Sequence, residues 1–502
     1  MSEQPFLLAL DQGTSSSRSA LFSRHGELLF SASKALAIEY PHDGWVQQNP
    51  NDIWDSQIAS MAALEKIIGV KKSKNIIICG ITNQRETTIL WRRSNGEPCG
   101  PAIVWQDGRT TDICNRWKLE GLEENWKYHT GLLLDPYFSA SKIRWLIEHE
   151  PSAEAALKDD DLCFGTVESW LLWKLTGGVN HYSDMSNASR TLLMNLEERK
   201  WDEKYCDITG IPLQSLPKLV PCRGDFGVIK KDLPFAGVKI QALLGDQQSA
   251  TLGQLCLNKG EAKCTYGTGA FLVINTEKEI YRSNAGLLST LGWTDDEGEP
   301  VYCLEGSLFN AGTVVQWLRD GLGIIEKAEE INSLANKANN SEGVMLVPAF
   351  TGWGTPHWDP NARGMLHGIT RDTKKEHIAR AALEGIALSV ATLIDLAQET
   401  LSTSLKELAV DGGAAASDPL LQAQANATGL LVRRPKSLES TARGVALLAG
   451  VESNLIPTLE GLASSRKGTE RHFSPQINSE SREKWKNKWN NAVQRSLHWH
   501  EH

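Results

Sequence analysis

Short runs of alternating apolar and polar residues open the chain, and turns rich in glycine and hydroxyl side chains separate them. PFLLALD at 5–11 is mostly apolar, RSALFS at 18–23 alternates, and LLFSASKAL at 28–36 follows a second turn. A period of two is typical of strands, whereas clusters of Gly, Ser and Asp mark turns. The opening segment therefore predicts a β-meander whose first hairpin tip carries Gly13 and a run of hydroxyl residues.

Longer periodic segments follow the meander. Residues 49–69 repeat apolar positions at helical spacing and start with Asn and Asp, which predicts a helix. NIIICGITN at 75–83 predicts a buried strand, and the polar cluster QRETT at 84–88 comes directly after it. Helical patterns occupy 139–176, and KIQALLGD at 239–246 returns to the pattern of a strand.

The opening hairpin has a counterpart in the middle of the chain. EAKCTYGTGAFLVINT at 261–276 alternates on both sides of a Gly-Thr-Gly tip, as the segment around DQGTSSSR does. Two such hairpins, about 250 residues apart, indicate a duplicated domain. We therefore predict an α/β protein of two related domains, 1–254 and 255–502.

Helices and strands also alternate in the second half. Helical periodicity predicts helices over 307–320, 326–340, 374–401, 419–429 and 481–497. ELAVDGG at 407–413 has the pattern of a strand that enters a turn of small residues. The polar stretch 464–480 predicts a loop.

Composition and charge narrow the class of protein. The 502 residues suffice for two or three domains, and 41% hydrophobic and 23% charged residues are typical of globular chains. With 52 Lys and Arg against 61 Asp and Glu, the net charge is −9, which argues against a nucleic-acid-binding surface. We expect most of the 17 Trp, such as Trp145, Trp170 and Trp173, to serve in core packing.

Cysteine usage and the N-terminus indicate a cytoplasmic protein. The nine cysteines are odd in number and form no CxxC pair, so neither a disulfide framework nor a zinc site is predicted, and we expect reduced, buried thiols. No apolar run reaches the ~18 residues of a membrane span. The start of the chain lacks the basic segment of a signal peptide, and Asp11 interrupts its apolar stretch.

Three glycine-rich turns are candidate phosphate sites. The chain has no GxxxxGK[ST], GxGxxG, HExxH or GxSxG pattern, which excludes the P-loop, the Rossmann site and the common hydrolase motifs. Backbone amides and hydroxyls of a glycine-rich turn can still hold a phosphate. Such turns lie at 13–17, 267–269 and 412–417. Each alone is ordinary turn chemistry, but the first two share one hairpin design, and the third opens a helix, where anions are favoured.

Charged residues stand at the ends of predicted strands. Asp11 and Asp246 each end a strand, and Arg85 and Glu86 follow a third one. Taken alone, each residue has a structural explanation: Asp11 as a turn aspartate, Asp246 as a helix N-cap, and the pair of Arg85 and Glu86 as a solvated ion pair. Ligands of open α/β folds, however, lie beyond the carboxyl ends of strands. A carboxylate beside a phosphate-binding turn can there hold Mg²⁺ through water.

Several of these segments resemble the glycerol kinases of the FGGY carbohydrate kinase family. They are DQGTSSSR (11–18), GWVQQNP (44–50), NQRETT (83–88), AIVWQ (102–106), LDPYFSASKIRWL (134–146), GDQQSA (245–250), TYGTGAF (265–271) and VPAFTGWGTPHWDPNARG (347–364). NQRETT is especially specific, because the sugar kinases of the same family carry a different segment there.

The resemblance implies an actin-like ATPase fold of two ribonuclease-H-like domains with a cleft between them. Domain 1–254 would carry the polyol site and the first phosphate loop, and domain 255–502 the second phosphate loop and the adenosine loop. The implied activity is ATP-dependent phosphorylation of glycerol to sn-glycerol 3-phosphate in glycerol catabolism, with Mg²⁺ held by Asp11 through water. Asp246 would be the general base, and Arg18 would face the γ-phosphoryl oxygens.

The resemblance also assigns binding residues. Glycerol would meet Arg85, Glu86, Trp105, Tyr137, Asp246, Gln247 and Phe271. ATP would meet Thr14, Ser15, Ser16, Arg18, Thr268, Gly312, Gln316, Gly413 and Ser417. Two departures stand out: Ser417 replaces the usual Asn near the adenine, and Arg443 lies in what should be a tightly packed helix. The family commonly forms dimers and tetramers, so a homo-oligomer is expected.

Two other functions remain open from the sequence. A kinase for another small polyol or ketose would need a larger pocket, and neither Phe271 nor Tyr137 is replaced by a small residue. An actin-like or chaperone-like ATP switch would need a peptide-binding domain or polymer contacts, and no extra domain is visible in the 502 residues. ATP turnover that depends on glycerol would distinguish the kinase from the switch.

Overall fold

The computed structural model describes residues 5–69, 73, 75–295, 297–465 and 470–499. The chain divides into two compact units. The first comprises Met1–Leu255, Ser289–Tyr302 and Ser440–Ser465, and the second comprises Cys256–Leu288, Cys303–Glu439 and Arg466–His502.

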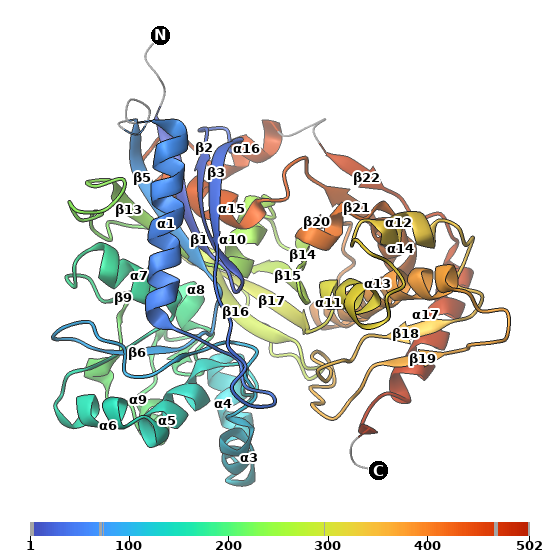
Figure 1. Ribbon diagram of the computed structural model, residues 1–502, viewed down its shortest axis with the longest axis horizontal. Coiled ribbons are helices and arrows are strands. Elements are labelled where there is room, and N and C mark those ends of the chain that lie inside the picture. The colour runs from blue at the N-terminus through green and yellow to red at the C-terminus, as the bar shows by residue number, and fades with distance from the viewer. Residues whose placement is uncertain (1–4, 70–72, 74, 296, 466–469, 500–502) are drawn as a thin grey trace. The chain divides into compact units, whose positions relative to one another are not determined.

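The first unit is built on a five-stranded sheet with the strand order β13-β5-β1-β2-β3 (Figure 1). Its strands are β1 (Phe6–Gln12), β2 (Ser16–Phe22), β3 (Leu28–Ala35), β5 (Ile76–Asn83) and β13 (Lys239–Gly245). Neighbours among β1, β2 and β3 are antiparallel, which confirms the predicted meander. β5 pairs with β1 and β13 pairs with β5 in parallel. The register therefore places Gln12, Asn83 and Gly245 beside one another at one end of the sheet.

Two helices cover this sheet. α1 (Pro50–Ile68) packs on β2 and β3, and α15 (Ser440–Glu452) packs on β1, β5 and β13 (Figure 1). α15 also touches α10 (Asp246–Gly253) so closely that a Cβ on Gly444 would lie 1.8 Å from the Ser249 carbonyl oxygen. The sequence of α15 thus has a small residue where two helices meet.

Arg443 fits beside this tight helix contact without entering it. Its guanidinium donates to the carbonyl oxygen of Gly26 over 3.1 Å and also to that of Gly253. Hydrogen bonds to two carbonyl groups satisfy the charged side chain in a partly buried position. The departure from the family pattern is therefore accommodated at the end of α10 and in the turn before β3.

The rest of the first unit consists of helices and short strand pairs. Its elements are β4 (Gln47–Gln48), β6 (Ile89–Arg92), β7 (Ala102–Ile103), α3 (Thr111–Leu119), α4 (Glu123–Thr130), α5 (Ser139–His149), α6 (Pro151–Lys158), β8 (Leu162–Gly165), α7 (Val167–Leu175), β9 (Tyr182–Asp184), α8 (Met185–Ala188), β10 (Met194–Asn195), β11 (Lys200–Trp201), α9 (Glu203–Thr209), η1 (Leu213–Ser215), β12 (Lys218–Val220) and α16 (Leu459–Ser465). Trp170 and Trp173 are buried with Trp91, as core packing requires. Trp145 differs, because it is half-buried and stacks on His149.

The second sheet has seven strands in the order β16-β17-β15-β14-β20-β21-β22. They are β14 (Ala262–Tyr266), β15 (Ala270–Glu277), β16 (Leu288–Thr294), β17 (Pro300–Leu308), β20 (Glu407–Asp411), β21 (Leu431–Arg434) and β22 (Arg471–Phe473). β14 is antiparallel to β15 and parallel to β20, and β20 is parallel to β21. The order β21-β20-β14-β15-β17 repeats β13-β5-β1-β2-β3 of the first sheet, which supports the predicted duplication.

Helices of the second unit surround α13 (Lys375–Leu401). The other elements are α11 (Gly312–Gln316), η2 (Trp317–Gly321), α12 (Glu330–Ala335), β18 (Met345–Val347), β19 (Met365–His367), η3 (Gly413–Ala416), α14 (Asp418–Thr428) and α17 (Ser479–Gln494). Among the described residues, α13 has the length and apolarity of a membrane span, yet 78% of its most apolar window is buried. It packs on α14, α12 and β18, as the core helix of a domain does.

The structure corrects several predicted elements. The helix expected over 307–320 begins only at Gly312, because β17 continues to Leu308. β16 and β17 were not predicted, since both are buried along their whole length and therefore lack a regular alternation. The helix expected over 326–340 shortens to α12. The loop expected over 464–480 contains β22, and its residues 466–469 lie outside the described part of the chain. All nine cysteines are buried and free, as predicted.

Candidate active site

The first glycine-rich turn closes the hairpin between β1 and β2. The Gly13 amide donates to the Ser16 carbonyl oxygen over 2.9 Å. Two neighbours hold Thr14: Gln48 Nε2 donates to its carbonyl oxygen over 2.6 Å, and the Trp105 indole N–H donates to its hydroxyl over 2.9 Å. Ser15 is exposed at the tip. The turn thus presents hydroxyls and backbone amides on a braced loop, which is the chemistry of a phosphate site.

Two charged residues flank this turn. Asp11 and Arg18 are direct cross-strand partners on β1 and β2. Burial raises the pKa of Asp11 to about 6; the charge of Arg18 lowers it, and the charge of Asp246 raises it. Arg18 Nε also donates to Ser33 Oγ over 3.0 Å. Asp11 and Asp246 therefore repel each other, and a cation between them would relieve that repulsion.

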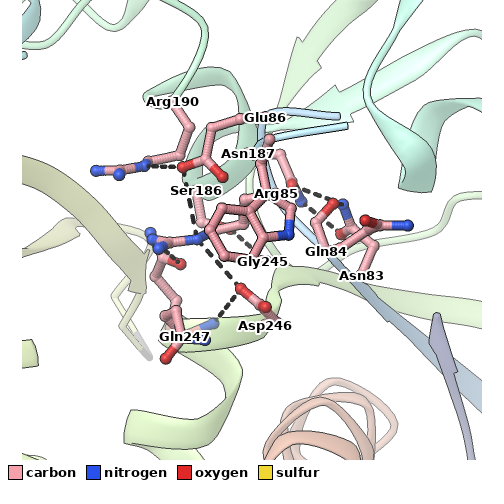
Figure 2. A network of polar contacts seen from close by, with 12 residues as sticks. Asn83, Gln84, Arg85, Glu86, Ser186, Asn187, Arg190, Gly245, Asp246 and Gln247 are labelled. Carbon is pink, nitrogen blue, oxygen red and sulfur yellow. Dashed lines mark hydrogen bonds and ion pairs between the residues drawn. The ribbon is translucent and has the colours of Figure 1, made fainter. Parts of the chain in front are cut away.

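Arg85 lies between two carboxylates beyond the end of β5 (Figure 2). Its Nε is 3.1 Å from Asp246 Oδ1 and 3.9 Å from Glu86 Oε1. The side chains of Arg85 and Glu86 are 1% and 2% exposed, whereas that of Asp246 is 29% exposed. Arg85 also donates to Gln248 Oε1 over 3.1 Å. Asp246 is thus the most accessible carboxylate of a cluster that is otherwise buried.

Glu86 has a constrained backbone. Its φ of 58° lies in the left-handed region, which costs a non-glycine residue about 1–2 kcal/mol. The hydroxyls of Thr88 and Ser139 both donate to its carbonyl oxygen over 3.0 Å and hold it there. Burial raises the pKa of Glu86, while Arg85 and Arg190 lower it. The surroundings therefore constrain the backbone of Glu86 and shift the pKa of its carboxyl group, and both are common properties of functional sites.

Asp246 is the first residue of α10 and directly follows β13. Gly245 joins the two elements, and its amide donates to Ser186 Oγ over 2.9 Å. A Cβ at Gly245 would lie 2.8 Å from Cδ of Arg85, so only glycine lets Arg85 approach Asp246. The Gln247 amide donates to Asp246 Oδ1 over 2.7 Å. The start of α10 thus positions Asp246, and Gln247 follows it on the same turn.

Trp105 and Tyr137 form an aromatic corner in the same unit. Their ring centroids are 5.8 Å apart at an interplanar angle of 76°. Because Trp105 also donates to Thr14, one side chain links this corner to the phosphate turn. Lys142 fixes the backbone of Tyr137, since its buried ammonium donates to the carbonyl oxygens of Tyr137 and Phe138 over 2.7 and 3.3 Å. Burial lowers the pKa of Lys142 to about 8.

The second glycine-rich turn joins β14 and β15 in the second unit. Gly267 donates to the Gly269 carbonyl oxygen over 2.9 Å, and the Ala311 amide donates to the Thr268 carbonyl oxygen over 2.8 Å. A Cβ on Gly312 would lie 2.6 Å from the Gly267 carbonyl oxygen, so the N-terminus of α11 packs directly on the turn. Thr268 and Gly312 therefore lie together, and Gln316 ends the same short helix. Phe271 follows on β15 and is 9% exposed.

The third turn follows β20 and leads into α14. Gly412 has a φ of 85°, and a Cβ there would lie 2.5 Å from the Tyr266 carbonyl oxygen. A Cβ on Gly413 would meet no atom within 4 Å, so that backbone is open. Ser417 caps α14: its Oγ accepts from the Leu420 amide over 3.3 Å and donates to Asn332 Oδ1 over 2.5 Å. The hydroxyl that replaces the family Asn thus has a structural role.

Most predicted site residues of the first unit are brought together. Asp11, Thr14, Arg18, Arg85, Glu86, Trp105, Tyr137, Asp246 and Gln247 all lie at the sheet end or contact a residue there. Thr268 adjoins Gly312 in the second unit, and Gly413 and Ser417 share the turn before α14. Arg190 and Lys142 were not among the site residues predicted from the sequence. The only signal for them was a cation within a run of small polar residues.

Comparisons with known proteins agree with this arrangement. The N-terminal domain of the FGGY family of carbohydrate kinases matches residues 6–253, and its C-terminal domain matches residues 262–453. A glycerol kinase from Aromatoleum aromaticum is 47% identical over 98% of this chain and 99% of its own. One from Oleidesulfovibrio alaskensis is 45% identical over 99% of each chain.

Solved structures show the same fold. Glycerol kinase from Plasmodium falciparum, solved with ADP, is 34% identical and covers 98% of each chain with a TM-score of 0.90. Gluconate kinase from Lactobacillus acidophilus, at 21% identity over 98% of this chain and 97% of its own, shares the fold with a TM-score of 0.83. The predicted α/β, actin-like fold of two domains is confirmed. The chain belongs to the FGGY family of carbohydrate kinases.

Proposed function

We propose that this protein is a glycerol kinase, which transfers the γ-phosphoryl group of ATP to glycerol and forms sn-glycerol 3-phosphate. The relatives from Aromatoleum aromaticum, Oleidesulfovibrio alaskensis and Plasmodium falciparum are glycerol kinases that align with this chain over nearly their full length, and the last was solved with ADP. The observation that carries the proposal is the cluster of Arg85, Glu86 and Asp246, which lies at the same sheet end as the Thr14 turn.

The chemistry of the cluster suits a small triol. Glycerol offers only hydroxyl groups, each of which can donate and accept a hydrogen bond. Glu86 and Asp246 supply acceptors, Arg85 supplies donors, and Gln247 can do both. Trp105 and Tyr137 would pack on the carbon chain and exclude water, which limits wasteful hydrolysis of ATP. Phe271 of the second unit is proposed to complete this apolar wall.

Asp246 is proposed as the general base. Its carboxylate accepts the proton of the attacking hydroxyl as the oxygen of glycerol bonds to the γ-phosphorus and the bond to ADP breaks. Transfer through a loose transition state depends mainly on positioning and on neutralisation of charge. Arg18 is proposed to face the γ-phosphoryl oxygens, because it lies beside the Thr14 turn and opposite Asp11. Closure of the two domains would assemble these groups, because they come from both halves of the chain.

The carboxylates also fit a Mg²⁺ ion bound through water. Asp246 raises the pKa of Asp11, so the two negative charges already oppose each other. Among the described residues, no three His, Cys, Asp or Glu side chains are grouped to bind a metal directly. Mg²⁺ commonly uses one or two carboxylates and keeps several waters. Asp11 would hold the ion, which supplies charge neutralisation for the phosphates of ATP.

We propose that the nucleotide binds to the loops described above. Thr14, Ser15 and Ser16 would contact its phosphates from the first unit. Thr268, Gly312, Gln316 and Gly413 would contact the nucleotide from the second unit, where Gly413 belongs to the adenosine loop and Ser417 would lie beside the adenine. The protein is further proposed to be cytoplasmic and to form a homo-oligomer, either a dimer or a tetramer. Sedimentation velocity over a range of protein concentrations would test the oligomer.

The test of the proposed function is ADP release by the purified protein. Glycerol, dihydroxyacetone, erythritol and xylulose are compared at equal concentrations, with a sample that contains no acceptor. We expect the highest kcat/KM for glycerol and little ADP without it. Inactivity with glycerol beside strong activity with a longer polyol or ketose would refute the assignment. Equal ATP turnover in all samples would indicate an ATP switch instead.

A further inference from the structure

Arg190 is a fully buried cation that no sequence pattern assigned to the site. Its side chain is 0% exposed, and its Nε donates to Glu86 Oε1 over 2.7 Å. Figure 2 shows Arg190 meeting the Glu86 carboxylate, while Arg85 lies between Glu86 and Asp246. The two arginines therefore differ: Arg85 is shared between two carboxylates, whereas Arg190 is hydrogen-bonded to Glu86.

The position of Arg190 follows from how its segment is attached to the sheet. Arg190 comes just after α8, and its amide donates to the Asn187 carbonyl oxygen over 2.9 Å. Asn187 exchanges two side-chain amide hydrogen bonds of 3.0 Å with Asn83, the last residue of β5. This reciprocal pair holds 187–190 against the strand end from which Glu86 projects. Arg190 thus approaches Glu86 from a rigid element.

Aromatic rings complete the surroundings of the guanidinium. The Arg190 Cζ atom lies 5.6 Å from the Tyr137 ring centroid and 5.2 Å from that of Phe138. A cation at this distance from an aromatic ring is attracted to its face. Arg190 therefore interacts with two residues that are proposed to contact the polyol, with Glu86 through a hydrogen bond and with Tyr137 through its ring.

We propose that Arg190 is a positioning residue for the phosphoryl acceptor: it holds the Glu86 carboxylate in the direction needed to accept a hydrogen bond from a hydroxyl of the polyol. This inference rests on the proposed function. An arginine is suited to the task, because its planar donor group keeps a defined geometry with a carboxylate. Since Arg190 acts through Glu86 and Tyr137, its loss should affect the polyol far more than ATP.

The charges around Glu86 predict how the pH dependence of kcat/KM for glycerol would distinguish a positioning role of Arg190 from a purely structural one. Arg85, Arg190 and Lys142 are the cations that face Glu86, and Asp246 is the opposing carboxylate. Removing Arg190 takes away a group that lowers the pKa of Glu86, so that pKa rises. If the ionised carboxylate binds the polyol, the acid limb of kcat/KM for glycerol moves to higher pH. A residue that only packs in the core would not move this limb.

The experiment compares Arg190→Met, Arg190→Lys and the surface control Arg144→Met. Arg144 pairs with Glu148 on the exposed side of α5. For Arg190→Met we expect the KM for glycerol to rise about 10- to 100-fold, the effect of a lost charged hydrogen bond, with the KM for ATP within about threefold of wild type. The acid limb should move to higher pH, because a charge that lowers the pKa of Glu86 is lost. Arg190→Lys keeps the charge, so its limb should stay near wild type while KM for glycerol rises about 3- to 10-fold.

A double-mutant cycle with Glu86→Gln separates positioning from folding. If Arg190 acts through Glu86, adding Arg190→Met to Glu86→Gln should change the KM for glycerol by less than about threefold. Unchanged KM and acid limb in Arg190→Met would overturn the proposal. If that variant does not fold, an unchanged KM in Arg190→Lys overturns it equally. A wild-type protein that is inactive with glycerol would instead refute the proposed function, so the two failures are distinguishable.

Discussion

Asp246→Asn tests the proposed general base with little change of shape. Two contacts of the carboxylate use Oδ1, which forms an ion pair with Arg85 Nε at 3.1 Å and accepts a hydrogen bond from the Gln247 amide at 2.7 Å. An asparagine oxygen can keep both contacts, so the start of α10 and the direction of Arg85 should persist. The substitution removes the capacity to accept a proton and one negative charge opposite Arg85.

The expected effect falls mainly on kcat. General-base catalysis contributes about 10²- to 10⁴-fold, which corresponds to about 3–5 kcal/mol of transition-state stabilisation. Because the Asp246 side chain is 29% exposed, losing its charge should cost little stability. Asp246 also raises the pKa of Asp11 and of Glu86, so both values should fall in the variant. The KM for glycerol should therefore change much less than kcat.

The assay is steady-state ADP release with glycerol, read together with the melting temperature and with glycerol binding by calorimetry. Asp320→Asn is a matched control, since Asp320 is an exposed aspartate paired with Arg319 far from the cluster in sequence. We expect a loss of at least 100-fold in kcat with glycerol binding retained. A loss below about tenfold, with a normal melting temperature, would remove Asp246 from the role of base.

Three further predictions concern the surrounding structure. Gly412→Ala should destabilise the protein by about 1–3 kcal/mol and raise the KM for ATP, because the new Cβ would lie 2.5 Å from the Tyr266 carbonyl oxygen. An unchanged melting temperature would contradict the predicted destabilisation. Lys142→Met should raise the KM for glycerol, because the carbonyl oxygens of Tyr137 and Phe138 lose their buried donor. Lys158→Met serves as the exposed control, and equal kinetics in both variants would show that Lys142 does not position Tyr137. Burial and Asp184 raise the pKa of Glu168 from 4.5 to about 7, so between these pH values the folded state binds one proton more than the unfolded state. The free energy of unfolding should therefore fall as the pH rises from 4.5 to 7, and Glu168→Gln should flatten this dependence. An unchanged slope in the variant would contradict the assignment.

The sequence predicted the parts of the fold that depend on local patterns. The two hairpins at 11–18 and 264–271 were recognisable because strands that alternate and turns rich in glycine are short-range features. β17 was missed for the opposite reason. It is buried along its length and includes polar Glu305 and Ser307, so no alternation marks it as a strand. Its place in the sheet depends on neighbours that are distant in sequence.

The same distinction applies to the candidate site. Asp11, Arg85, Glu86 and Asp246 were predicted because each stands at the end of an apolar strand, and parallel strands bring such ends together. Arg190 could not be found in this way, because it is separated from Glu86 by 104 positions and ends no strand. The structural role of Ser417 was also hidden, since its hydrogen bond to Asn332 joins α12 to the turn before α14.

The identity and stoichiometry of the product test the central claim most directly. The protein is mixed with ATP, Mg²⁺ and glycerol, and phosphorus NMR follows the nucleotides and the phosphorylated product, with a stereospecific dehydrogenase to identify the enantiomer. We predict one sn-glycerol 3-phosphate for each ADP formed and no detectable inorganic phosphate. ADP that accumulates with inorganic phosphate and without glycerol phosphate would contradict the account.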